Sequence, residues 1–256
     1  MSALLRAVDA ELLKMKRTLA LTLIVVMPLS ICLLDLAILL ENTNFSSDPT
    51  YDVWGFLLRN NIAFWGILML PLFVTLETAL VATLDHNAQS WKHVYALPLP
   101  RWSIYMAKQL INLALIAGSM IVVGIATMLT GVFLQVSGLL PDERVLPVFP
   151  WGTLIQSLTL LFLASWLIIA IHTWVSLRWH SFTVASAVGI VATVVGFIVV
   201  NSDTYAGYFP WTLPLRAAGP LVMDATATPL ALPLGFIGGI VFALVACWDV
   251  TRQDVL

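Results

Sequence analysis

Six apolar runs, each long enough to cross a bilayer, constrain the fold of this 256-residue chain more than any other feature. The runs cover residues 18–40, 61–84, 110–136, 151–177, 181–200 and 230–248. An α-helix rises about 1.5 Å per residue, so about 20 residues cross a hydrocarbon core of roughly 30 Å. We therefore predict an all-α membrane protein with six transmembrane helices.

The composition fits a surface that faces lipid rather than water. Hydrophobic residues make up 60% of the chain and charged residues only 10%, whereas soluble domains carry about 25% charged residues. No basic run resembles a nucleic-acid-binding surface, so we expect no nucleic-acid partner. The cysteines and histidines lack metal-ligand spacing, and we expect no bound metal.

The distribution of Lys and Arg predicts the orientation of the spans. Nine of the 12 basic residues lie before the first span, between spans two and three, between spans four and five, and after the sixth. Basic residues concentrate in cytoplasmic segments of membrane proteins. We therefore expect a multi-pass protein of the cell inner (cytoplasmic) membrane, with both termini in the cytoplasm.

Residues 1–17 predict an amphipathic helix on the inner membrane surface. Leu4, Leu5, Val8, Leu12 and Met15 recur at helical spacing, while most charges fall elsewhere around the helix. Such a helix places its apolar side in the interface and its basic residues near anionic lipid headgroups. The alternative is a positively charged flank that only sets the topology.

The segment after the second span predicts a short cytoplasmic helix at residues 85–97. It contains no Gly or Pro, and Asp85 is suited to cap its start. Trp91 and Tyr95 lie one turn apart, and Pro98 and Pro100 end the helix. A helix joined to spans at both ends can transmit a push from a cytoplasmic partner. An aromatic turn at the inner interface is the alternative.

Glu77 is a charged residue inside the second span. A charge at the centre of a membrane helix costs roughly 2.5–3.5 kcal/mol, so such residues usually face protein and find a partner. We predict a structural ion pair with Lys108 or Arg101, which begin the next span. A proton relay would need a second buried acid or His along a path, and the sequence suggests none.

Two weaker signals lie near the last span. Gly235 and Gly239 form a G-x-x-x-G pattern, which permits close helix approach but also arises by chance in apolar segments. The segment 201–229 is rich in aromatic residues and proline. It fits either an aromatic belt at the outer interface or short re-entrant helices.

The order of these motifs resembles the ABC-2 type transporter permeases, most closely the branch associated with lantibiotic and bacteriocin self-protection. That family shows a Glu ending the second span, a coupling helix, an LP-x-x-R turn, a Lys opening the third span and an Arg-x-Asp tail. The matching segments here are Glu11–Thr18, Glu77, Trp91–Lys92, Leu97–Arg101, Lys108 and Trp248–Asp254.

The resemblance implies the six-helix ABC-2 (type V exporter-like) fold and a permease subunit that expels a hydrophobic or amphipathic peptide, bacteriocin, drug or lipid. It implies two partners, a cytoplasmic ABC ATP-binding subunit and a second permease chain, identical or a sibling. The chain lacks a G-x-x-x-x-G-K-[ST] loop, so ATP and Mg²⁺ should bind the partner and this chain should need no cofactor. Contacts to the ATP-binding subunit are expected from Asp85, Trp91, Lys92, Tyr95, Pro98, Pro100 and Arg101.

A non-transporting scaffold or an intramembrane enzyme is the alternative from another functional class. An intramembrane enzyme would need a Ser/His, Asp/Asp or metal constellation within the spans. Glu77 and Asp35 lie near opposite faces of the membrane and do not provide one. We therefore expect no catalytic residues.

Overall fold

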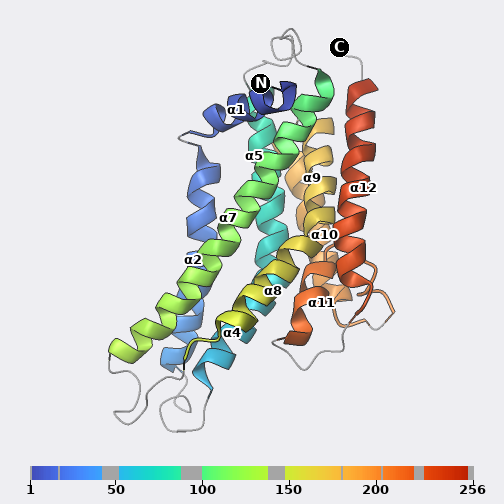
Figure 1. Cartoon of the computed structure of the whole chain (residues 1–256). Helices are drawn as coiled ribbons and strands as arrows, with labels where there is room; N and C mark the ends of the chain where they lie inside the picture. Colours follow the sequence, from blue (N-terminus) through green and yellow to red (C-terminus); the bar gives the residue numbers. More distant parts are fainter. Residues whose placement is uncertain are drawn as a thin grey trace.

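The computed structural model describes residues 2–16, 18–41, 52–87, 100–137, 148–179, 181–202, 204–221 and 228–252. In this part of the chain every regular element is a helix (Figure 1). The elements are α1 (Ala3–Met15), α2 (Leu19–Glu41), α4 (Val53–Phe64), η1 (Trp65–Met69), α5 (Leu70–Asn87), α7 (Arg101–Val136), α8 (Trp151–Ala164), α9 (Trp166–Arg178), α10 (Phe182–Val199), α11 (Leu213–Ala218), η2 (Gly219–Leu221) and α12 (Ala231–Arg252).

The predicted all-α membrane fold is confirmed. Within the described residues, five helical stretches are long and apolar enough to cross a membrane, and the bent pair α8–α9 brings the number to six. The long helices run side by side as a bundle, and α1 lies across one end of it (Figure 1). We call this the α1 end of the bundle, and the last turn of α12 lies there too.

The second and third spans begin earlier than the apolar runs predicted. Helix α4 begins at residue 53 rather than 61, and Asp52 caps it by accepting the Gly55 N–H at 3.0 Å. Helix α7 begins directly after Pro100 rather than at residue 110. Polar residues near the predicted starts, such as Asn61 and Gln109, are buried within the bundle. Hydropathy places the end of a span at such residues, although protein surrounds them here.

The fourth span is broken rather than continuous. Helices α8 and α9 meet at Ser165 with a bend of 40°, and the Ser165 hydroxyl donates to the Phe162 carbonyl at 2.7 Å. The short helix α11 packs against α8, η1 and α12 near this bend. The sequence left two alternatives for residues 201–229, an aromatic belt or short re-entrant helices. Residues 213–221 form two short helices, α11 and η2. That they are re-entrant stays a prediction.

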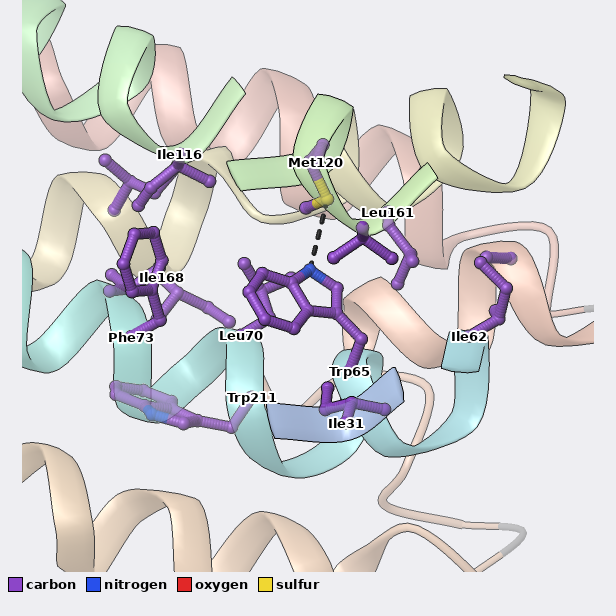
Figure 2. Close-up of a cluster of buried hydrophobic side chains, with 14 residues drawn as sticks. Ile31, Ile62, Trp65, Leu70, Phe73, Ile116, Met120, Leu161, Ile168 and Trp211 are labelled. Atoms are coloured by element: carbon purple, nitrogen blue, oxygen red, sulfur yellow. Dashed lines mark hydrogen bonds between the residues drawn. The ribbon is translucent and has the colours of Figure 1, made fainter. Parts of the chain in front are cut away.

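The main hydrophobic core surrounds a π-helical turn in the second span (Figure 2). Trp65 begins this turn, is fully buried, and donates its indole N–H to the Met120 sulfur of α7 at 3.2 Å. Phe73 and Trp65 pack with ring centroids 5.9 Å apart. The core joins α2, α4, η1, α5, α7, α8, α9 and α11 through Ile31, Ile62, Trp65, Leu70, Phe73, Val74, Ile116, Met120, Val123, Leu161, Ile168, Ile169, Trp211 and Ala218.

Helix α12 makes close backbone contact with the end of α8 and the start of α9 through the two glycines of the G-x-x-x-G pattern. A Cβ atom on Gly239 would lie 2.6 Å from the Trp166 carbonyl carbon and 2.7 Å from the Leu167 nitrogen. A Cβ atom on Gly235 would overlap the backbone of Ala164. Both glycines are therefore needed because they let α12 approach the α8–α9 bend, as small residues do in membrane bundles.

We expect Gly239→Ala to lower stability by about 1–3 kcal/mol, because the added methyl group meets backbone that cannot move aside. Gly238→Ala is the matched control, since its Cβ would lie 3.6 Å from the flexible Leu167 side chain. Thermal unfolding of both variants in lipid nanodiscs measures the difference. Equal unfolding midpoints would contradict the close packing of α12 on α9.

Candidate functional site

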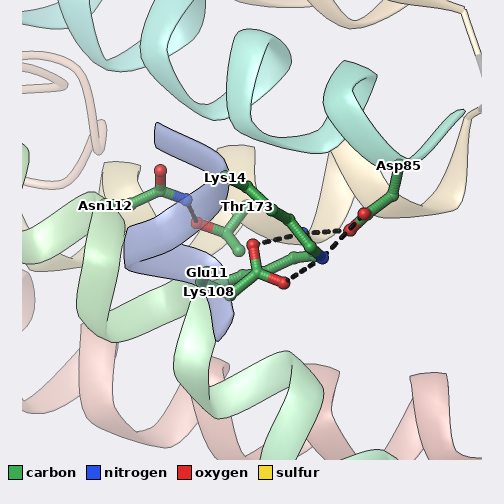
Figure 3. A network of polar contacts seen from close by, with 6 residues as sticks. All are labelled: Glu11, Lys14, Asp85, Lys108, Asn112 and Thr173. Carbon is green, nitrogen blue, oxygen red and sulfur yellow. Dashed lines mark hydrogen bonds and ion pairs between the residues drawn. The ribbon is translucent and has the colours of Figure 1, made fainter. Parts of the chain in front are cut away.

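Four charged side chains meet inside the α1 end of the bundle (Figure 3). Glu11 and Lys14 come from α1, Asp85 from the last turn of α5, and Lys108 from the third turn of α7. Glu11, Asp85 and Lys108 are each at most 3% exposed. These residues are distant in sequence, and α1 must lie across the bundle for them to meet.

The four groups form a closed ring of alternating charge. Lys14 Nζ lies 2.7 Å from Glu11 Oε1 and 2.8 Å from Asp85 Oδ1. Lys108 Nζ lies 2.9 Å from Glu11 Oε2 and 2.5 Å from Asp85 Oδ2. Each carboxylate thus uses one oxygen for each lysine. Two acids and two bases cancel, so the bundle contains four charges here without net charge. We call these four residues the charge ring.

Buried apolar residues flank the charge ring on α1. Ala7 and Met15 lie one turn before and after Glu11 on the same face of α1, and both are buried. Met15 belongs to a second hydrophobic cluster, together with Ala20, Val81, Ile111 and Leu115. Helix α1 therefore attaches to α5 and α7 through an apolar surface with the charge ring beside it.

Lys14 is the member of the charge ring nearest to solvent, with 30% of its side chain exposed. Burial by itself would lower the pKa of its ammonium group, but the carboxylates of Glu11 and Asp85 outweigh burial and raise this pKa above the ordinary lysine value. A raised lysine pKa gives stability that is complete below the ordinary value and is lost only as pH rises through the raised one. Lys14 therefore stays charged at neutral pH.

The ion pair predicted between Glu77 and Lys108 is not formed. Lys108 pairs with Glu11 and Asp85, and neither carboxylate oxygen of Glu77 accepts a hydrogen bond in the described part of the chain. The reason is the antiparallel register of α5 and α7. Lys108 lies early in α7 and so lies beside the end of α5, whereas Glu77 lies about 12 Å of helix deeper than Asp85.

The start predicted for the helix at residues 85–97 is wrong. Asp85 does not cap a new helix but lies within α5, which continues to Asn87. Residues 88–99, including Trp91, Lys92, Tyr95 and Pro98, lie outside the described residues. The structure does place both ends of this segment, because Pro100 is the N-cap residue of α7 and Arg101 its first residue.

Sequence reasoning missed Glu11, Lys14 and Asp85 as members of one site. The available signal was the position of Glu11 between Ala7 and Met15, at a spacing of four residues that places all three on one helix face. An acid on an apolar face of an interfacial helix needs a partner, and Lys14 at i+3 is close enough to be one. The sequence alone did not show that α5 and α7 would supply the other two charges.

An apolar groove lies between α2 and α7, on the outer surface of the bundle. Its volume is about 190 Å³, and its lining is almost entirely apolar. The lining residues are Leu29, Cys32, Leu33, Leu36, Ala126, Leu129, Thr130 and Phe133. In a membrane this groove would open to lipid rather than to water. In the described ranges no cluster of three or more His, Cys, Asp or Glu residues could hold a metal ion.

We expect Lys108→Met to lower stability by roughly 3–5 kcal/mol, because it leaves the acids of the charge ring with an uncompensated negative charge in a buried site. Thermal unfolding of the purified chain measures this loss.

Lys16→Met is the matched control, because Lys16 is the exposed C-cap residue of α1. Its substitution should change stability little. The double variant Glu11→Gln/Lys108→Met should lose less than the two single losses combined, because it removes one charge of each sign. Additive losses would contradict the charge ring.

The comparisons with known proteins agree with the architecture. The family described as ABC-2 family transporter protein matches residues 7–199, which include most of α1, the charge ring and the helices through α10. No curated protein and no solved structure matches the chain. A match over three quarters of the chain shows the family, and the multi-pass helical fold is consistent with it. The chain belongs to the ABC-2 family of transporter proteins.

Proposed function

We propose that this chain is the permease subunit of an ATP-driven ABC exporter of the cell inner membrane, with both termini in the cytoplasm. The family and the multi-pass helical fold support a membrane permease. The distribution of basic residues supports the orientation, since Arg6, Lys16, Arg101 and Arg252 all belong to segments at the α1 end of the bundle. The α1 end then faces the cytoplasm.

The charge ring is the observation that carries this proposal. Helix α5 ends at Asn87, within one turn of Asp85, and α7 begins after Pro100, two turns before Lys108. The ring joins Asp85 and Lys108 to each other and to α1. A force applied to segment 88–99 would therefore act on α1, α5 and α7 together rather than on a loose loop.

The motor and its nucleotide belong to a partner in this proposal. The chain has no phosphate-binding G-x-x-x-x-G-K-[ST] loop, so ATP and Mg²⁺ would bind a cytoplasmic ATP-binding subunit. That subunit would dock on segment 88–99, with Trp91 and Tyr95 as buried aromatic anchors. Asp85, Lys92, Pro98, Pro100 and Arg101 would shape the docking site. A second permease chain, identical or a sibling, would complete the path.

The cargo we infer is hydrophobic or amphipathic, such as a peptide, bacteriocin, drug or lipid. The apolar groove between α2 and α7 supports a molecule that is handled at the lipid interface. Its volume of about 190 Å³ is below the roughly 300–1,000 Å³ typical of pockets for drug-sized ligands. It therefore suits an alkyl chain or a side chain of a larger cargo.

We expect the double variant Trp91→Ala/Tyr95→Ala to lose the ATP-binding subunit during purification from native membranes. Removing two aromatic anchors typically costs enough binding energy to lower affinity by a factor of a hundred or more, at about 2 kcal/mol or more per hot spot. The measurement is the amount of ATP-binding subunit per permease chain after affinity purification, together with the ATPase activity of the complex.

The double variant Tyr205→Ala/Tyr208→Ala is the matched control. Both tyrosines are exposed, at 67% and 64%, and they lie between α10 and α11, away from the α1 end. This control should retain the ATP-binding subunit. Recovery of a full complement of that subunit with Trp91→Ala/Tyr95→Ala would refute docking on segment 88–99. Absence of any co-purifying ATP-binding subunit with the wild-type chain would refute the exporter itself.

A further inference from the structure

A second set of buried polar side chains lies deeper in the bundle than the charge ring, where α5, α7 and α9 meet. Asn112 of α7 donates to the Thr173 hydroxyl of α9 at 3.0 Å. Ser176 of α9 donates to the Thr78 hydroxyl of α5 at 3.3 Å. Glu77 directly precedes Thr78, and it is 0% exposed. These contacts place Glu77 at the level of a polar junction of three helices, which we call the α5–α7–α9 junction.

The face of α5 that carries Glu77 is turned towards α7. Val81 lies four residues after Glu77, and residues at this spacing share one face of a helix. Val81 packs in a cluster with Ile111 and Leu115 of α7, the residues on either side of Asn112 along that helix. Glu77 therefore lies within the bundle and does not face lipid.

The α5–α7–α9 junction contains hydrogen-bond acceptors without donors. In the described residues, neither oxygen of Glu77 accepts a hydrogen bond, and the side-chain carbonyl oxygen of Asn112 does not either. Both side chains are at most 1% exposed. Buried polar atoms normally have partners, and here each missing partner is a donor or a positive charge.

No neighbouring charged group supplies that positive charge. The elements packed against α5 include α10 and η1, which carry no titratable residue, and α2, α7 and α9, which do. The titratable residues of these three helices are Cys32, Asp35, Glu41, Arg101, Tyr105, Lys108, His172 and Arg178. None of them makes a hydrogen bond or an ion pair with Glu77. Asp85, farther along α5 itself, is paired with both lysines of the charge ring.

An ionised carboxylate without a partner is too costly to bury in a low-dielectric interior, and such a group takes up a proton instead. The protonated carboxyl gains an O–H donor, the type of group that the unpaired side-chain oxygen of Asn112 lacks. We propose that Glu77 is a proton-binding site that is occupied in this packed bundle and releases its proton when water enters the α5–α7–α9 junction.

The consequence for transport rests on the proposed exporter function. Opening of a path between the helices would hydrate the junction, and Glu77 would then release its proton. Each conformational cycle would thus include the release and uptake of one proton per permease chain. The relative stability of the packed and open bundles would depend on pH, with low pH favouring the packed one.

Infrared spectroscopy of the purified permease in lipid nanodiscs tests the proton site directly. At about pH 7 an ordinary glutamate, with a pKa of about 4.3, is ionised. We expect the wild-type chain to show the C=O stretching band of a protonated carboxylic acid at this pH, and Glu77→Gln to lose it. Asp35→Asn is the matched control because it removes another buried carboxyl group, on α2. It should leave the Glu77 contribution in place.

Labelling with ¹³C-glutamate gives a second measurement that needs no variant, in case Glu77→Gln fails to fold. The band should shift with labelled glutamate, and the shifted component should remain in Asp35→Asn. Absence of a glutamate band at neutral pH would overturn the proposal. So would a band that disappears on adding Na⁺ but not choline, because a metal cation would then occupy the junction. The measurement uses the permease alone, so its failure would not affect the exporter proposal.

Discussion

The mutual neutralisation of four charges at the α1 end is the interaction on which the rest of this architecture depends. A single buried charge is costly, and each pair in the charge ring repays that cost only while both partners are present. Glu11 is therefore more than a surface residue of an interfacial helix, since without it Lys108 would lie beside one acid and a second lysine. The ring requires α1 to be docked whenever α5 and α7 are packed, and it holds the two ends of segment 88–99 at a fixed separation.

The bends of the bundle also follow from the demand that backbone polar groups be satisfied away from water. Irregular backbone is tolerated at membrane depth only where protein surrounds it. The π-helical turn at Trp65–Met69 lies within the main hydrophobic core, and α11 packs against it. The break at Ser165 is covered by the close approach of α12 through Gly235. Both irregular segments are thus covered by neighbouring helices rather than by lipid.

Hydropathy predicted which segments cross the membrane, but it placed the starts of the second and third spans too late. It treats Asn61 or Gln109 as a residue that leaves the membrane, although a polar side chain in a bundle can be buried against another helix. The pairing of Lys108 failed for a related reason. The sequence shows that a buried acid needs a cation, but the choice between Glu77 and Asp85 depends on how two antiparallel helices are aligned. That alignment is set by side-chain packing between α5 and α7, which no local pattern encodes.

The contrast between Glu77 and Asp85 follows from this alignment. Both are fully buried acids of one helix, eight residues apart. Asp85 lies at the level of Lys108 and within reach of α1, so it stays ionised between two ammonium groups. Glu77 lies two turns deeper, beyond the reach of any lysine of the ring, and neither of its carboxylate oxygens accepts a hydrogen bond from the described residues. The acids and lysines of the charge ring are ionised in water as well, so hydration does not change their charge. An unpaired acid beneath the ring responds to hydration, and one helix therefore carries both a rigid link and a site that senses opening.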